Sequence, residues 1–134
     1  MTVATLWKAL ALWFLLAVLA IANGMLREKV LIPALGASIG MQFSGITLSV
    51  AILLVSCFAL PWYGALPSIQ YWLIGLLWLL MTILFEFGFG HFIAHKSWAE
   101  LLDAYNVSKG NLWVVVLVAT FVSPWLAAQL RSYI

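Results

Sequence analysis

Four long apolar runs, separated by short polar breaks, dominate the hydrophobic pattern of this chain. They cover residues 6–26, 34–60, 68–93 and 111–130. A helix needs about 20 mostly apolar residues, rising 1.5 Å each, to cross roughly 30 Å of hydrocarbon. Short linkers between such helices leave no room for a soluble domain and favour antiparallel neighbours. The pattern therefore predicts one all-α domain over residues 1–134, an integral membrane bundle of four antiparallel transmembrane helices.

Polar and proline-containing segments set the expected ends of these helices. The charged run 27–29, followed by Pro33, is expected to close the first span, because charges are costly in hydrocarbon and proline lacks a backbone donor. Residues 61–67 combine two prolines with a glycine and predict a tight, uncharged hairpin. Trp62 and Trp72 are the expected interface anchors beside it, since indole rings favour the headgroup level.

The segment 97–106, between the third and fourth runs, has a different pattern. Its apolar residues follow the spacing of one helix face, and Ser97 and Glu100 have the spacing of a capping box. We expect a short amphipathic helix in the membrane interface, with Trp98 and Tyr105 among the headgroups. A docking helix for a partner protein is the alternative.

The composition also indicates a lipid environment, and it argues against a soluble domain and a nucleic-acid-binding protein. Hydrophobic residues make up 66% of the chain, and charged residues only 7%. A soluble domain carries about 25% charged residues. The net charge is +2, and no basic cluster exceeds Arg27 and Lys29, so a nucleic-acid partner is not expected. The expected partner is the lipid bilayer itself.

Lysine and arginine are unevenly distributed between the two sides of the predicted bundle. The side that holds both termini and the central hairpin carries two of these residues, Lys8 and Arg131. The other side carries four: Arg27, Lys29, Lys96 and Lys109. Because cytoplasmic loops are enriched in these residues, we expect the charged loops in the cytoplasm and both termini outside.

Glu86 is the leading candidate for a functional residue. Counted from Ser68 it lies about 27 Å along the third helix, close to the edge of the hydrocarbon. Carboxylates at this depth usually face protein neighbours. It belongs to a stripe of small and polar residues, which is expected to pack inward: Gly75, Thr82, Glu86 and Gly90.

The second run carries a matching stripe of small residues. Gly36, Gly40 and Ser44 recur every four residues, which lets two helix backbones approach closely. Packing within the chain is the expected use of this stripe, and homodimerisation is the alternative.

The first three helices meet the cytoplasmic boundary near Arg27, Gln42 and Glu86, so these residues and His91 are expected to form one polar cluster. Within it we hypothesise an ion pair between Glu86 and Arg27, whose guanidinium suits a bidentate contact. The alternative is that Glu86 only extends to the interface or fixes the fold.

Catalytic and metal-binding motifs are absent from the sequence. His91 and His95 are four residues apart, a spacing that suits two metal ligands, but no third ligand is evident, so they are weak candidates and no metal or other cofactor is predicted. Enzymatic activity has no positive support, although a lipid-facing site built from Glu86, His91 and Arg27 would leave no familiar motif.

Three segments together resemble a group of small, uncharacterised bacterial inner-membrane proteins of about this length: residues 23–31 (NGMLREKVL), residues 85–91 (FEFGFGH), and the positions Ser97-Trp98, Leu101-Leu102 and Tyr105-Asn106. The resemblance covers nearly the whole chain. It implies a four-helix protein of the bacterial inner membrane and no activity.

Two function classes follow from these features. The first is a structural or accessory membrane component that binds a larger partner or a second copy of itself, with a polar cluster centred on Glu86. The second is an oligomeric transporter or channel for an ion, a proton or a small molecule. One off-centre carboxylate is a poor polar path across 30 Å of hydrocarbon, which favours the accessory role.

Overall fold

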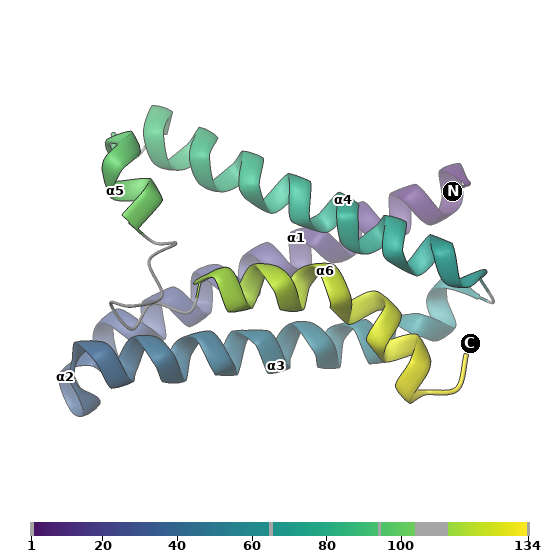
Figure 1. The fold of residues 1–134 in the computed structure, drawn as a ribbon, viewed down its shortest axis with the longest axis horizontal. Coiled ribbons are helices and arrows are strands. Elements are labelled where there is room, and N and C mark those ends of the chain that lie inside the picture. Colours follow the sequence, from purple (N-terminus) through teal and green to yellow (C-terminus); the bar gives the residue numbers. More distant parts are fainter. Residues whose placement is uncertain (1, 65, 94, 104–112, 134) are drawn as a thin grey trace.

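The structure is a computed structural model that describes residues 2–64, 66–93, 95–103 and 113–133 (Figure 1). Its elements are α1 (Val3–Leu26), the π-helical turn η1 (Arg27–Leu31), α2 (Ile32–Leu35), α3 (Ala37–Tyr63), α4 (Ser68–Gly88), the π-helical turn η2 (Phe89–Ile93), α5 (Trp98–Asp103) and α6 (Trp113–Leu130). Within the described residues, four helical stretches are long and apolar enough to cross a membrane: Val3–Leu35, Ala37–Tyr63, Ser68–Ile93 and Trp113–Leu130. The predicted all-α, multi-pass membrane bundle is confirmed.

The bundle has two chemically different ends. The N-terminus, the C-terminus and the turn between α3 and α4 lie at one end, whereas α2 and α5 lie at the other (Figure 1). We call the second one the charged end, because η1 and the start of α5 bring most of the charged residues there. α6 packs against both α3 and α4, and α1 packs against α3 and α4.

The first helix does not end at the charged run, as the sequence suggested, but continues through η1 and α2 to Leu35. The backbone N–H of Ile32 donates to the carbonyl of Arg27, five residues back, so η1 holds one extra residue in its turn. This wider turn comes directly before Pro33, the second residue of α2, so the regular helical hydrogen bonding is already interrupted where the proline lacks its N–H. The expectation that the charges and Pro33 stop the helix was therefore wrong.

Gly36 makes the turn that separates the first two membrane helices. Its φ of 89° lies in the left-handed region that favours glycine, and a Cβ there would have no atom within 4 Å. Gly36 is thus a turn residue and not the packing residue that the sequence suggested. Gly40 does lie in a close contact, because a Cβ on it would come 3.0 Å from the backbone of Leu31 and Ile32.

Two indole groups join α1 to α4. Trp78 of α4 is fully buried, and its Nε1–H donates to the carbonyl of Ala9 at 2.9 Å. In the opposite direction, the Nε1–H of Trp13 donates to Thr82 Oγ1 at 3.1 Å. These bonds fix the depth of α4 relative to α1, because each indole has one donor and reaches one acceptor.

α4 and α6 approach each other closely at Gly75. A Cβ built on Gly75 would lie 1.9 Å from the carbonyl oxygen of Phe121, so only glycine fits between the two backbones. Trp72, one turn earlier, stacks on Trp125 with ring centroids 5.2 Å apart. Trp72 is half-buried against α6, whereas Trp62, the other expected anchor, is 48% exposed.

Pro61 lies inside α3, because the helix continues past the predicted hairpin start to Tyr63 and the chain turns at Gly64, where φ is 77°. Proline has no N–H, so the carbonyl of Cys57, four residues earlier, lacks its usual helical donor. Arg131, just after α6, supplies one: its Nη1 donates to the Cys57 carbonyl at 2.6 Å. A neighbouring helix thus satisfies the carbonyl that the proline leaves free.

We expect this contact to depend on the proline. Replacing Arg131 by alanine should lower the free energy of unfolding by about 1 kcal/mol, because the Cys57 carbonyl loses its charged donor and Pro61 supplies no backbone N–H in its place. In a Pro61→Ala background the same change should cost clearly less, since the alanine restores the backbone N–H. A double-mutant cycle measured by unfolding in detergent tests this coupling. Equal costs in the two backgrounds would show that Arg131 acts in another way.

Candidate functional site

A cavity of about 460 Å³ lies between α1, α3, α4 and α6 and reaches the charged end. We call it the Glu86 cavity. Its volume is within the range of roughly 300–1,000 Å³ that small-molecule sites occupy. Its polar lining residues are Asn23, Arg27, Ser44, Thr82, Glu86, Lys96, Glu100, Trp113 and Thr120, and its aliphatic ones include Leu16, Ala17, Ala20, Leu48, Ile52 and Val116.

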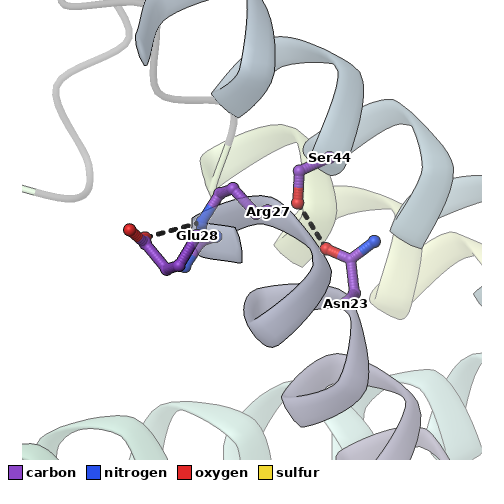
Figure 2. A network of polar contacts seen from close by, with 4 residues as sticks. All are labelled: Asn23, Arg27, Glu28 and Ser44. Carbon is purple, nitrogen blue, oxygen red and sulfur yellow. Dashed lines mark hydrogen bonds and ion pairs between the residues drawn. The ribbon is translucent and has the colours of Figure 1, made fainter. Parts of the chain in front are cut away.

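One wall of the Glu86 cavity is polar because α1 and α3 meet there through hydrogen-bonding side chains. The hydroxyl of Ser44, which is buried, donates to the side-chain oxygen of Asn23 (Figure 2). One turn further along, the Nε–H of Arg27 donates to Glu28 Oε1 at 3.2 Å. Asn23 and Arg27 lie four residues apart, so both line the same side of the cavity.

The lining from α4 includes Glu86. Its Oε2 accepts a hydrogen bond of 2.7 Å from the indole Nε1–H of Trp113, the first residue of α6. The carboxylate thus lies between α4 and α6 and is turned toward protein, as the sequence suggested. This contact ties α4 to α6, because a hydrogen bond between membrane helices stabilises their association.

The ion pair expected between Arg27 and Glu86 is not formed. Among the described residues, Arg27 makes its ion pair with Glu28, the next residue in the chain. Arg27 and Glu28 are consecutive residues of η1, so the carboxylate lies within reach of the guanidinium without any contact between helices. Arg27 and Glu86 nevertheless line the same cavity.

Gln42 and His91 do not join the predicted cluster. Gln42 is exposed on α3, and neither residue lines the Glu86 cavity. His91 stacks instead on Trp98, with ring centroids 3.9 Å apart, and its Nδ1–H donates to the carbonyl of Lys96 at 2.9 Å. His91 therefore holds α5 against the end of η2.

α5 covers part of the predicted amphipathic helix, and Tyr105 lies outside the described residues. The backbone N–H of Glu100 donates to Ser97 Oγ at 3.1 Å, which is the N-terminal half of the expected capping box. Trp98 is 48% exposed beside its stack on His91. The turn that leads into α5 is closed by the backbone N–H of Lys96, which donates to the Gly90 carbonyl at 2.8 Å.

The two histidines do not share a helix face. η2 ends at Ile93, and His95 follows it with a φ of 58°, outside the helical region. The spacing argument for two metal ligands required the helix to reach His95. No group of three or more potential metal ligands occurs among the described histidine, cysteine, aspartate and glutamate residues.

Away from the charged end, the Glu86 cavity becomes apolar. Its two deep hydroxyl groups are already used within their own helices: Thr82 donates to the Trp78 carbonyl and Thr120 to the Val116 carbonyl. The remaining depth is lined by side chains such as Leu16, along about 16 Å of α1 counted from Arg27. The cavity therefore has a charged mouth and an apolar interior.

Besides the hydroxyl of Thr120, four polar residues of the cavity were missed by the sequence reasoning: Asn23, Lys96, Glu100 and Trp113. A signal existed for Asn23, which is an amide inside an apolar run, four residues before Arg27. For the other three the sequence carries no such signal, because they reach the cavity only through the way that α5 and α6 pack.

No family model, curated protein or solved structure matches this chain. The arguments about function below therefore rest on the geometry and chemistry of the Glu86 cavity.

Proposed function

We propose that this protein is an accessory component of the bacterial inner membrane, with both termini in the periplasm, that binds a second membrane molecule in the Glu86 cavity. The observation that carries the proposal is the chemical gradient along this cavity. Charged and hydrogen-bonding groups gather at its mouth, and apolar side chains line its depth. Such a site is suited to a guest that is polar at one end and apolar along the rest.

A void lined by apolar side chains is costly to leave empty, because its walls lose van der Waals contacts. A guest that fills the Glu86 cavity would restore these contacts. Its polar end would meet donors and acceptors at the charged end, where Lys96 and Glu100 are exposed. Binding is therefore favoured by both parts of the cavity.

An oligomeric transporter or channel is the second candidate function. It needs a polar route across about 30 Å of hydrocarbon. Beyond the cavity, the bundle interior is filled by buried apolar side chains, including Ala9, Leu12, Ile74 and Trp78. A route for ions through a single chain would have to displace this packing, so the geometry favours binding over conduction.

The test of the binding function is the mass of the purified particle. In native mass spectrometry, the full chain of 14.9 kDa is expected to carry the added mass of a bound molecule. Ala20 lines the cavity, so Ala20→Phe should fill it and remove that mass. The matched control is Ala22→Phe, because Ala22 lies on the same helix but is exposed and does not line the cavity.

A bare wild-type particle, or an Ala20→Phe particle that keeps the added mass, would contradict the binding function. Liposome flux tests the transport alternative. We expect no ion or proton flux above that of empty liposomes. A flux that disappears with Glu86→Gln would instead support transport.

A further inference from the structure

Resting on the binding function proposed above, we infer that the guest of the Glu86 cavity is a zwitterionic phospholipid: its phosphate and ammonium groups lie at the charged mouth, and one acyl chain lies in the apolar depth. The other chain stays in the bilayer. Four observations lead to this ligand class, and they concern the balance of charge, the unused donors, the acceptors and the shape of the cavity.

Among the described residues that line the cavity, side chains of cationic and of acidic type are equal in number, and Glu28, the ion-pair partner of Arg27, is not one of them. Two cationic side chains, Arg27 and Lys96, and two carboxylates, Glu86 and Glu100, line the same cavity. A purely anionic headgroup would meet two carboxylates, and a purely cationic one would meet two cations. A headgroup that carries both signs can avoid both repulsions, because charge complementarity selects a ligand as much by what it repels as by what it attracts.

Unused donors at the mouth suit a phosphate. The Nε–H of Arg27 donates to Glu28. The Nη2 of Arg27 lies beside Gly24, which also lines the cavity: a Cβ built on Gly24 would be 3.7 Å from this nitrogen. The two terminal nitrogens of the guanidinium make no hydrogen bond to another described residue. The ammonium group of Lys96 likewise has no hydrogen bond or ion pair within the described part of the chain. Together they can hold the oxygens of one phosphate.

The acceptors suit an ammonium group. The Oε1 of Glu100 lies 3.4 Å from the Ser97 hydroxyl, its contact among the described side chains. A carboxylate has about four acceptor sites, so this contact leaves room for the donors of a primary ammonium. Glu100 and Lys96 both line the cavity, so an acceptor and a cation lie at the same mouth.

The depth of the cavity suits an acyl chain. From Ser44 to Ile52 the lining of α3 extends over about 12 Å, and it becomes apolar after Ser44. An acyl chain gains no hydrophobic free energy when it moves from lipid into protein, because both are apolar. What it gains is contact with walls that would otherwise face a void. Selectivity is therefore expected to come from the headgroup.

The experiment uses the full chain, purified in detergent and depleted of lipid, with three probes of identical acyl chains: phosphatidylethanolamine, phosphatidylglycerol and diacylglycerol. Native mass spectrometry should show one phosphatidylethanolamine per chain, bound more tightly than either of the others. Arg27→Gln should weaken its binding by about tenfold, since a charge-assisted contact to the phosphate is lost. The matched control is Lys29→Gln, because Lys29 is exposed in the same turn and does not line the cavity.

Three outcomes would overturn the assignment: diacylglycerol binding as tightly as phosphatidylethanolamine, phosphatidylglycerol binding more tightly, or Lys29→Gln weakening binding as much as Arg27→Gln. The melting temperature of each variant without lipid shows whether it is folded. The bound molecule could instead be of another kind, such as a protein segment, and still be lost from the Ala20→Phe variant. That result would refute the phospholipid assignment but would agree with the binding function. A cavity that holds nothing would refute both.

Discussion

Replacing Trp78 by alanine is expected to lower the free energy of unfolding by about 3–5 kcal/mol, the range for removal of a large buried aromatic side chain. Trp78 is fully buried in the core cluster, and its indole donates to the Ala9 carbonyl at 2.9 Å. Alanine would leave a void between α1 and α4 and would remove this bond. Unfolding of the purified protein by increasing fractions of SDS in mixed micelles measures the loss.

Trp7→Ala is the matched control, because Trp7 lies on α1 but is 67% exposed. It should change the free energy of unfolding by less than about 1 kcal/mol. Trp78→Phe separates packing from hydrogen bonding, since it keeps an aromatic ring but has no donor. Its expected cost is about 1 kcal/mol, the scale of one hydrogen bond between membrane helices. Equal losses for Trp78→Ala and Trp7→Ala would contradict the described core.

The substitution Gly75→Ala is expected to cost about 3 kcal/mol, the upper part of the usual range for overpacking. An added Cβ would lie 1.9 Å from the carbonyl oxygen of Phe121, and the clash is with backbone, so a side-chain rotation cannot relieve it. α4 and α6 would have to move apart. The same SDS titration measures this loss.

Gly88 provides the control within the same helix. A Cβ on Gly88 would have no atom within 4 Å, so Gly88→Ala should change the free energy of unfolding by no more than about 0.5 kcal/mol. A Gly75→Ala variant as stable as Gly88→Ala would mean that α4 and α6 do not approach as closely as described.

The fold was largely predictable from the sequence, because few backbone conformations can cross a bilayer. In hydrocarbon no water can satisfy the backbone polar groups, and a helix satisfies nearly all of them within its own segment, so a run of about 20 apolar residues predicts a helix. Where the helix leaves the hydrocarbon this constraint weakens. That is why the run 27–29 and Pro33 did not mark the end of the first helix, and why Gly36 did.

The candidate site was only partly predictable. Glu86 stood out because a carboxylate in an apolar helix is expensive, and such residues face protein. Its partner Trp113 lies 27 residues further along the chain, and an indole in an apolar run gives no sign of which acceptor it will reach. Arg27 was assigned to a polar cluster with Glu86 on the basis of depth alone, but its ion pair is with the next residue of η1, Glu28.

By itself, the sequence determined that this chain crosses a membrane with four helices, because hydrophobic length is a property of each segment taken alone. Only the tertiary structure decided that Asn23, Ser44, Glu86, Lys96 and Trp113 surround one cavity and that His91 and Gln42 lie outside it. The physical reason is that the inner face of a helix in lipid is not marked by hydrophobicity, since tails and core are equally apolar. Which faces meet is settled by close contacts such as that of Gly75 with Phe121 and by single bonds such as that of Trp78 with Ala9.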